Sequence, residues 1–429
     1  MSATTREQRA LEAKVSDVFR SFASAGYRNR AFLSELWREE HLDYLLKGMT
    51  RLPASFTVLD SSRPWLCYWI VHSMALLGRQ LDPALQADTI EFLKHCKDPL
   101  GGYGGGPGQI AHLATTYAAV GTLVSIGGAQ ALSSIDREKI LEFLLRMKDP
   151  SSGGFRLHDG GEMDVRGCYT AISVAYLLNI LVPPLLEKLG EYVASCQTYE
   201  GGIGGEPGAE AHGGYTYCGL AALIMADQVD SLDLPGLLNW AAFRQGKVEG
   251  GFQGRTNKLV DGCYSFWQGG VFPLLQQVVT KLISQQTSGS SIMHEEIEDD
   301  SDTEIGGIMP ADIETFTAEK LFPVRKARNQ QHRPFHNPTA LQGYILLCCQ
   351  VLNGGLIDKP GKSKDYYHTC YCLSGLSTAQ HCLSTNPEDH PPSGHVFGPY
   401  SNLLDSTHPL LNFHMKRYME AVDYFVSKA

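Results

Sequence analysis

The 429-residue sequence contains no apolar run that approaches the roughly 20 residues needed to cross a bilayer. Its first residues, Met-Ser-Ala-Thr-Thr-Arg-Glu-Gln-Arg, lack the apolar segment of a secretory signal. Its last residues, Phe-Val-Ser-Lys-Ala, match neither a prenylation signal nor a peroxisomal signal. We therefore expect a cytoplasmic protein without stable membrane insertion.

The sequence also lacks the paired Cys-x-x-Cys motifs that hold structural zinc. Its eleven cysteines are spread along the chain, and in a reducing compartment we expect them to be thiols. Any metal site must then be assembled from distant segments. The sequence has no excess of basic residues, since its formal net charge is -10. Seven acidic residues lie in the run 295–304, so the rest of the chain has a net charge of -3. We expect no nucleic-acid binding.

A double glycine recurs along the chain. It stands at 101–102, 153–154, 201–202, 250–251 and 354–355, so the intervals are 52, 48, 49 and 104 residues. Each double glycine follows an apolar helical pattern and precedes a polar loop and a second apolar helix. Self-similarity at this period indicates a repeat architecture. We expect the double glycines to supply positive-φ positions at the C-caps of the first helices.

The second helix of each unit is apolar nearly all round, as in residues 170–178 and 218–225, so it is expected to be buried between neighbours. Paired helices of this kind either stack into an open solenoid or close into a ring. We favour an all-α ring of inner and outer helices, because the loops carry the polar residues and the inner helices carry aromatics. A hydrophobic central cavity follows from that arrangement.

The domain prediction has two parts. An N-terminal helical region, residues 1–60, is expected to pack against a partner or to close one end, and the ring occupies residues 61–429. Residues 282–335 interrupt the ring. This segment is rich in serine, acidic residues and proline, so we interpret it as a solvated, mostly disordered insertion.

The stretch 255–267, Arg-Thr-Asn-Lys-Leu-Val-Asp-Gly-Cys-Tyr-Ser-Phe-Trp, combines two cations, a carboxylate, a thiol and aromatic rings. It follows a glycine-rich turn and leads into a helical pattern, so Asp261 is expected to be the N-cap, with Cys263 in the first turn. Such a position favours anions and lowers the pKa of a thiol. The ordinary alternative is that Asp261 only caps the helix and Cys263 is a small buried hydrophobe.

Equivalent loops of a ring share one rim, which brings their polar residues together. His212 comes from one loop, Arg255 and Lys258 from the next, and Asp358 and His368 from the last. A rim of cations and histidines above an apolar cavity suits an amphiphile with an anionic head and a hydrocarbon tail.

Three ligands and one open position are typical of catalytic zinc. Asp261, Cys263 and His368 give an O, S, N set. His368 and Cys372 form a rival pair, because residues four apart share a helical face. Cys370 and Cys372 are more often core thiols than ligands. The residues alone leave this choice open.

The repeats and two strings carry a family resemblance. The strings are 255–267 and Asp-Lys-Pro-Gly-Lys-Ser-Lys-Asp-Tyr-Tyr-His-Thr-Cys-Tyr-Cys-Leu-Ser-Gly-Leu-Ser at 358–377. They closely resemble the beta subunits of protein farnesyltransferases, in the protein prenyltransferase family, over roughly residues 60–280 and 340–385. The resemblance implies an alpha-alpha toroid, a heterodimer with a helical alpha subunit, and transfer of a farnesyl group from farnesyl diphosphate to the cysteine of a C-terminal Cys-aliphatic-aliphatic-X motif.

The resemblance also implies residue roles. Asp261, Cys263 and His368 would hold Zn2+, and Asp358 would assist Mg2+. The predicted diphosphate ligands are His212, Arg255, Lys258 and Tyr264. The predicted residues of the isoprenoid tunnel are Arg166, Tyr169, Tyr215, Cys218, Trp267, Trp65 and Trp69, with Tyr367 between lipid and peptide.

Two details of the resemblance favour a fifteen-carbon donor. Trp65 is the bulky floor expected for a fifteen-carbon prenyl chain. At the position of Asp358, the resemblance implies a lysine in the geranylgeranyl relative. His112 is a further substrate-binding candidate. Single members have ordinary explanations: Arg166 as a salt-bridged surface arginine, His112 as a cap-region histidine and the tryptophans as core. The alternatives for the whole chain are a geranylgeranyltransferase type I beta subunit and a non-catalytic helical-repeat scaffold.

Overall fold

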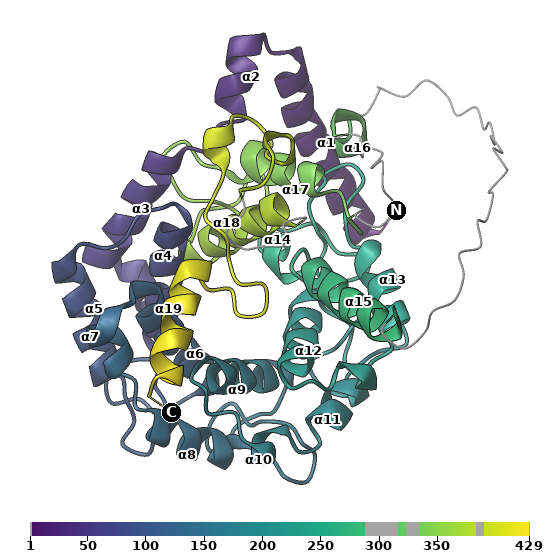
Figure 1. The fold of residues 1–429 in the computed structure, drawn as a ribbon. Coiled ribbons are helices and arrows are strands. Elements are labelled where there is room, and N and C mark those ends of the chain that lie inside the picture. The colour runs from purple at the N-terminus through teal and green to yellow at the C-terminus, as the bar shows by residue number, and fades with distance from the viewer. Residues whose placement is uncertain (1, 288–315, 323–333, 383–389, 429) are drawn as a thin grey trace.

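The computed structural model describes residues 2–287, 316–322, 334–382 and 390–428 of the chain. Within these ranges the chain is helical and forms only isolated antiparallel β-bridges, such as Lys97 with Tyr103. The helices form a ring, as Figure 1 shows. The predicted all-α ring is therefore confirmed.

The inner helices face the centre of the ring. They are α4 (Arg63–Leu76), α6 (Leu113–Ile126), α9 (Val165–Leu177), α12 (Gly213–Met225), the short α14 (Tyr264–Trp267) with α15 (Val271–Thr287), and α18 (Tyr366–His381). Because α4 packs against both α6 and α18, the ring closes on itself. α6 is apolar nearly all round and buried along almost its whole length, as expected for a helix with neighbours on every side.

The outer helices pair with the inner ones. They are α3 (Arg38–Thr50), α5 (Pro83–His95), α8 (Arg137–Met147), α11 (Leu189–Ser195), α13 (Leu234–Ala242), and α17 (Pro338–Tyr344) with the π-helical turn η4 (Ile345–Cys349). They are amphipathic: α8 buries Ile140, Phe143, Leu144 and Met147, which lie on one helical face.

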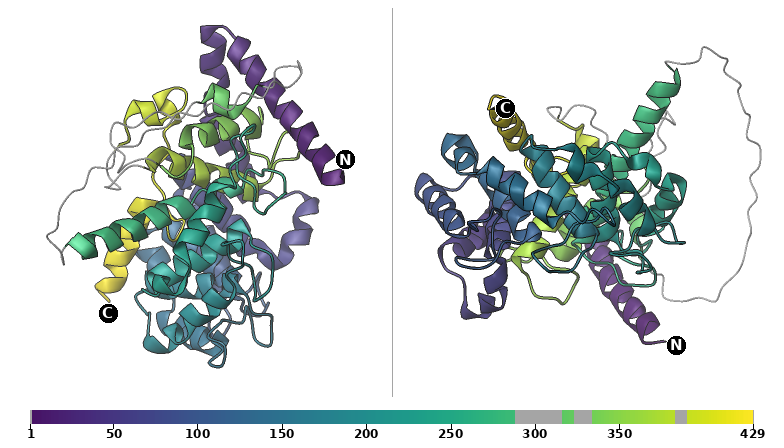
Figure 2. Two further views of the ribbon diagram at one scale, coloured as in Figure 1. Left: turned by 90° about the vertical axis from the view of Figure 1, so that its right-hand side faces the viewer. Right: turned by 90° about the horizontal axis from the view of Figure 1, so that it is seen from below.

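The remaining elements are short or peripheral. They are α1 (Ala3–Ser24), α2 (Tyr27–Leu33), η1 (Ala54–Ser62), α7 (Gly128–Ser133), α10 (Pro183–Leu186), η2 (Val229–Ser231), α16 (Ala318–Leu321), η5 (Ser393–His395), η6 (Tyr400–Asn402) and α19 (Met415–Val426). Figure 2 shows that α1 and α19 lie on opposite faces of the ring.

The double glycines do not cap the helices that precede them, so that prediction was wrong. The helix α5 ends at His95, and Gly101 lies beyond it in a turn closed by the Lys97–Tyr103 bridge. Gly101 has φ +96°, and a Cβ there would lie 1.9 Å from the carbonyl oxygen of Lys139. Each double-glycine turn instead packs against the next outer helix. Glycine is needed there because the two backbones approach closely and because φ is positive.

The loops share one rim, as predicted. At five places around the ring, a backbone N–H at or just before the start of an inner helix donates to a carbonyl oxygen of the next unit's loop, over 2.7–2.9 Å. The pairs are Arg63 with Gly105, Leu113 with Leu157, Val165 with Gly205, Gly213 with Gly254, and Gly262 with Asp358. Hydrogen bonds between units therefore fix the height of each polar loop relative to its neighbours.

Residues 1–60 contribute α3 to the outer ring, since α3 packs against α4. The boundary at residue 60 stays a prediction. Parts of the proposed insertion, 282–335, lie in described structure. α15 continues to Thr287, and Phe316 bonds through its backbone N–H to Ser16 Oγ at 2.7 Å. The insertion as a whole stays a prediction, and its acidic run lies outside the described residues.

All eleven cysteines are free thiols, as expected. In the part of the chain that the structure describes, no helix combines the length and apolar character needed to span a membrane.

Candidate functional site

The stretch 255–267 lies at the rim, where the chain enters α14. Asp261 Oδ1 accepts a hydrogen bond from the backbone N–H of Cys263 at 2.8 Å. The helix itself begins at Tyr264, and Cys263 occupies the N-cap position without a side-chain cap. The predicted N-cap role of Asp261 is therefore corrected: its carboxylate orders the turn before the helix and also faces His368.

Asp261, Cys263 and His368 form a candidate metal site. One ligand atom from each residue lies within 4.8 Å of the others. Among the described residues, this is the group of three metal-ligating side chains that the structure brings together. The rival thiol of Cys372 is not in the group; its Sγ lies 3.9 Å from the carbonyl oxygen of Ile357. Tertiary structure thus joins the two strings that are about a hundred residues apart in the chain.

His368 is oriented by a second carboxylate. Its Nδ1 lies 2.6 Å from Asp365 Oδ2, and Asp365 Oδ1 also accepts from the backbone N–H of His368 at 2.7 Å. Its Nε2 lies 3.3 Å from Asp261 Oδ1. A carboxylate on one ring nitrogen fixes the tautomer and leaves the other nitrogen to ligate a metal.

The donor types of the group suit a divalent cation. Burial by itself would lower the pKa of His368, but hydrogen bonds to Asp261 and Asp365 outweigh burial and raise that pKa to about 10. Burial, and then the charge of Asp261, raise the pKa of the Cys263 thiol well above its usual range. A divalent metal supplies the positive charge that would stabilise the carboxylate and a thiolate together, so the O, S, N donors fit such an ion.

An aromatic cavity of about 390 Å³ opens beside the candidate metal site. Tyr264 follows the ligand Cys263, and Tyr367 precedes the ligand His368. The indole N–H of Trp267 donates to the Tyr367 hydroxyl at 3.2 Å. The lining residues are Trp65, Trp69, Ala114, Arg166, Tyr169, Thr170, His212, Gly214, Tyr215, Cys218, Tyr264, Trp267, Tyr367 and Tyr371.

The predicted tunnel residues all line this cavity. Sequence reasoning missed Ala114, Thr170, Gly214 and Tyr371. Tyr371 carried a usable signal, because it stands four residues after Tyr367 on α18 and therefore shares its face. Ala114, Thr170 and Gly214 are small, so only the packing of their helices shows that they border a cavity.

Cationic and histidine side chains lie in the cavity wall and near it. His212 Nε2 lies 2.9 Å from the Tyr264 hydroxyl, and burial, then the charge of Arg255, lower the pKa of His212 to about 4. Arg255 pairs with Glu210 at 3.0 Å. Arg166 pairs with Asp164 and also lies over the Tyr215 ring, 5.7 Å from its centre. Arg166 thus combines its ordinary role with a place in the cavity wall.

Some predicted residues lie outside the cavity lining. Lys258 is exposed, and Lys359 Nζ pairs with the carboxylate of Asp358. Burial, and then the nearby charge of Asp261, raise the pKa of Asp358. His112 accepts from the backbone N–H of Ala114 at 3.0 Å, which is its cap-region role.

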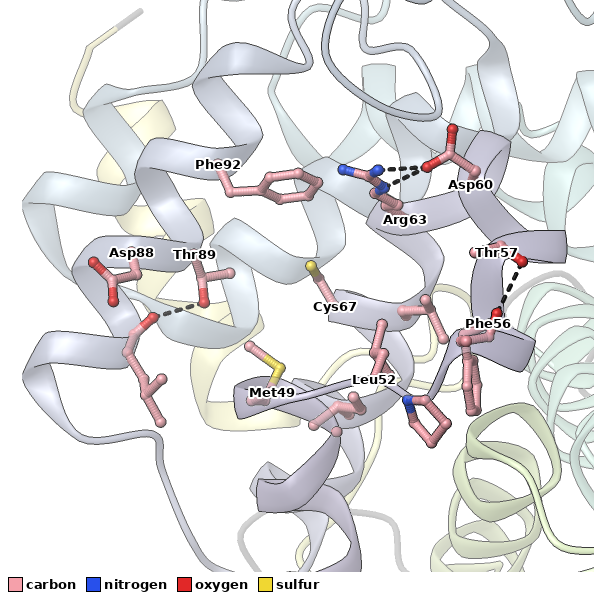
Figure 3. A pocket seen from close by; sticks show the side chains of 16 residues that line it. Met49, Leu52, Phe56, Thr57, Asp60, Arg63, Cys67, Asp88, Thr89 and Phe92 are labelled. Atoms are coloured by element: carbon pink, nitrogen blue, oxygen red, sulfur yellow. Dashed lines mark hydrogen bonds and ion pairs between the residues drawn. The ribbon is translucent and has the colours of Figure 1, made fainter.

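A second cavity of about 490 Å³ lies on the other side of α4 and is shown in Figure 3. Met49, Phe56, Cys67 and Phe92 line it, and burial raises the pKa of the Cys67 thiol to about 12. Among the described residues, no group of three metal-ligating side chains lies here. The aromatic cavity with its neighbouring donors is therefore the candidate functional site.

Comparison with known proteins agrees with this geometry. The family model "Prenyltransferase alpha-alpha toroid domain" matches residues 36–413. The protein farnesyltransferase subunit beta of Arabidopsis thaliana is 49% identical over 441 residues, covering 100% of this chain and 91% of that protein. The corresponding subunit of Pisum sativum is 53% identical over 374 residues, or 85% of this chain and 89% of that protein.

The chain belongs to the protein farnesyltransferase beta-subunit family. Its fold also matches the solved structure described as Candida albicans protein geranylgeranyltransferase-I complexed with GGPP, with a TM-score of 0.64 and 18% identity. That match covers 91% of this chain and 99% of the other. At this identity the match supports the toroid fold alone. The family resemblance, the predicted toroid and the protein farnesyltransferase class are thus confirmed.

Proposed function

We propose that this chain is the catalytic subunit of a zinc-dependent protein farnesyltransferase. It would transfer the farnesyl group of farnesyl diphosphate to the cysteine thiol of a C-terminal Cys-aliphatic-aliphatic-X motif, in a heterodimer with a helical alpha subunit. The observation that carries the proposal is the placement of an O, S, N donor group at the edge of an aromatic cavity whose wall includes Arg166 and His212. The names of the full-length relatives support it.

The aromatic cavity suits the hydrocarbon part of the donor. Its tryptophans and tyrosines offer a large apolar surface, and burial of that surface against a hydrocarbon is favourable at about 25 cal/mol per Å². Trp65 and Trp69 stack with their rings 5.7 Å apart and form one wall. We assign the Trp65 side of the cavity to the end of a fifteen-carbon chain.

Arg255, Lys258, His212 and Tyr264 would hold the diphosphate. Breaking the carbon–oxygen bond leaves negative charge on the diphosphate, so donors aimed at its oxygens stabilise the transition state more than the ground state. His212 is held neutral, since its pKa is lowered to about 4. We therefore assign it to hydrogen bonding, with Tyr264, and assign the charge to Arg255 and Lys258.

Asp261, Cys263 and His368 would hold Zn2+, with Asp365 orienting His368. When bound, the zinc would keep the substrate cysteine as a thiolate near neutral pH. The new carbon–sulfur bond forms as the carbon–oxygen bond breaks, and diphosphate leaves. Asp358 would assist Mg2+, which would neutralise charge on the leaving diphosphate. The ring walls exclude water that would otherwise compete with the thiol.

The geranylgeranyltransferase type I alternative rests on the shared toroid fold. It is weaker, because the relatives that cover nearly the whole chain carry the farnesyltransferase name. A non-catalytic scaffold would not need the three donors. Co-expression with an alpha subunit, followed by metal analysis and a panel of fifteen- and twenty-carbon donors with peptide acceptors, tests all three. Equal transfer of both donors contradicts the Trp65 argument, and absence of stoichiometric zinc contradicts the ligand assignment.

A further inference from the structure

Asp358 lies on the rim segment between η4 and α18, beside the candidate metal site. Its backbone carbonyl oxygen accepts two hydrogen bonds, from the backbone N–H of Gly262 at 2.7 Å and from the Tyr344 hydroxyl at 3.1 Å. Gly262 stands between the predicted zinc ligands Asp261 and Cys263. The backbone of Asp358 is therefore fixed relative to these ligands, and its carboxylate can reach only a small region beside them.

The carboxylate of Asp358 binds a cation from the next residue of the chain. Lys359 Nζ pairs with Asp358 Oδ1, and the two side chains are only 12% and 16% exposed. In contrast, the side chains of the Arg255–Glu210 pair are 41% and 47% exposed. Water and salt screen a buried pair much less than an exposed one. The ammonium of Lys359 therefore acts strongly on the carboxylate of Asp358.

A tight turn follows Lys359. The backbone N–H of Lys362 donates to the carbonyl oxygen of Lys359 at 3.1 Å, with Pro360 and Gly361 at the two central positions. Gly361 has φ +91°, as the third residue of a type II turn requires. Lys362, at the other end of the turn, is exposed. The turn thus separates two lysines of equal charge, one mostly buried against Asp358 and one in solvent.

The surroundings of the Asp358 carboxylate suit a hard cation. Burial, and then the charge of Asp261, raise the pKa of Asp358, while Lys359 and His368 act against that rise. Mg2+ binds carboxylate and phosphate oxygens. A carboxylate that faces a second acid and already binds an ammonium is a donor of this type. The residues present therefore fit Mg2+, and Lys359 supplies positive charge where Mg2+ would supply it.

We propose that Lys359 is an internal counter-cation that competes with Mg2+ for the Asp358 carboxylate and so sets the magnesium concentration that the enzyme needs. This inference rests on the proposed function, because it concerns the magnesium that Asp358 would assist. Mg2+ demands near-octahedral oxygen ligands at about 2.0–2.1 Å. A divalent ion also repels an ammonium twice as strongly as a single charge does at the same distance. Lys359 must therefore leave Asp358 when the metal binds, and it is a positioning residue that acts through Asp358.

The test measures metal binding directly, in the zinc-containing heterodimer loaded with farnesyl diphosphate. Mn2+ takes the same kind of oxygen ligands as Mg2+, and electron paramagnetic resonance reports its free fraction. We expect Lys359→Met to lower the dissociation constant of Mn2+ by about fivefold or more, which is the most that an exposed ion pair is worth. Methionine keeps a long unbranched side chain but removes the competing charge. The magnesium concentration for half-maximal transfer should fall in the same variant.

Lys362→Met is the matched control, because it removes the same charge from the same turn but from an exposed side chain. Its dissociation constant for Mn2+ should change by less than about twofold, since solvent and salt screen that charge. Lys359→Arg keeps a cation beside Asp358 and should stay close to the wild type. Equal decreases in Lys359→Met and Lys362→Met would show an effect of net charge alone, and that result overturns the proposal.

Two further outcomes contradict the competition. If Lys359→Met melts earlier but keeps the wild-type dissociation constant for Mn2+, the pair only stabilises the fold. If the dissociation constant rises, Lys359 helps the metal to bind.

Failure of the proposed function gives a different result. In that case the wild type binds no more Mn2+ than Asp358→Ala does, so the magnesium role of Asp358 fails together with the competition. Failure of this inference alone leaves Mn2+ bound through Asp358 in the wild type, with no gain in affinity in Lys359→Met. Should Lys359→Met not fold, Lys359→Gln is measured in the same assay.

Discussion

His41 Nδ1 accepts a hydrogen bond from the backbone N–H of Gly355 at 2.9 Å and so joins the first outer helix to the last double glycine. The other ring nitrogen of His41 lies 2.9 Å from Gln350 Oε1. The neighbouring Gly354 approaches α3 so closely that a Cβ would lie 1.9 Å from the carbonyl oxygen of Glu40. Contacts between segments more than 300 residues apart thus close the ring.

A methyl group at Gly354 should weaken the contact between α3 and the last double glycine that closes the ring. Gly354 has φ +75°, and Gly354→Ala would force its Cβ against the backbone of α3. We expect a loss of about 2 kcal/mol or more in the free energy of unfolding, measured by denaturant titration. Gly78→Ala is the control, because Gly78 has φ +76° but no atom within 4 Å of the added Cβ. Equal losses in the two variants would mean that backbone strain, and not the close approach, accounts for the effect.

The contribution of His41 to the stability of the ring should decrease in acid. Burial lowers the pKa of His41 from 6.5 to about 4, so between those values the unfolded chain binds a proton that the folded chain does not. The contribution of His41 to stability should therefore rise with pH from 4 to 6.5 and be level above that range. His41→Asn keeps an acceptor but does not titrate, and it should reduce the rise by about 2 to 3 kcal/mol. Unfolding at several pH values checks this, and identical slopes would contradict it.

Loss of the Cys263 thiol should remove the metal. Cys263→Ala leaves two of the three donors, so we expect the purified heterodimer to fall well below one equivalent of zinc, measured by elemental analysis. Cys372→Ala deletes a thiol that is also buried but not among the three donors. It should keep its zinc. The reverse pattern would reinstate Cys372 as the ligand.

Arg255 should act on the diphosphate and not on the metal. We expect Arg255→Ala to raise the KM for farnesyl diphosphate by about tenfold or more, with unchanged zinc content, because a charge-assisted hydrogen bond is lost. Arg79→Ala is the control, since Arg79 is also exposed and paired with an acid, Glu39, at 3.5 Å. Steady-state kinetics at fixed peptide gives the answer. A change in the KM for the peptide alone would contradict a role of Arg255 at the diphosphate.

Asp358 should set the magnesium requirement. Removal of its carboxylate in Asp358→Ala should raise the magnesium concentration needed for half-maximal activity while zinc stays in place. Asp358→Asn keeps the shape of the side chain but removes its charge. If the charge attracts Mg2+, this variant should need as much magnesium as the alanine variant. A magnesium titration of the transfer rate decides, and an unchanged midpoint would refute the role.

Sequence patterns predicted the ring and its apolar centre for a physical reason, and the family resemblance named most of the cavity wall. The period of the double glycines marks each unit, and apolar helices with aromatic residues must face a common interior. Trp65, Tyr169 and Trp267, which the resemblance assigned to the tunnel, lie in the lining. The position of the double glycines relative to the helices was mispredicted, because the close approach of the next outer helix depends on a segment about forty residues away.

The sequence by itself determined the helical units, the order of the polar loops and the chemical types at the rim. Local periodicity and composition encode these directly. Only the tertiary structure decided that Cys263 and not Cys372 stands with Asp261 and His368, that His41 closes the ring, and that tyrosine hydroxyls of four inner helices donate to the backbone carbonyls of residues 409–412. Each of these depends on distances between segments far apart in the chain, and such distances are set by packing around the whole ring.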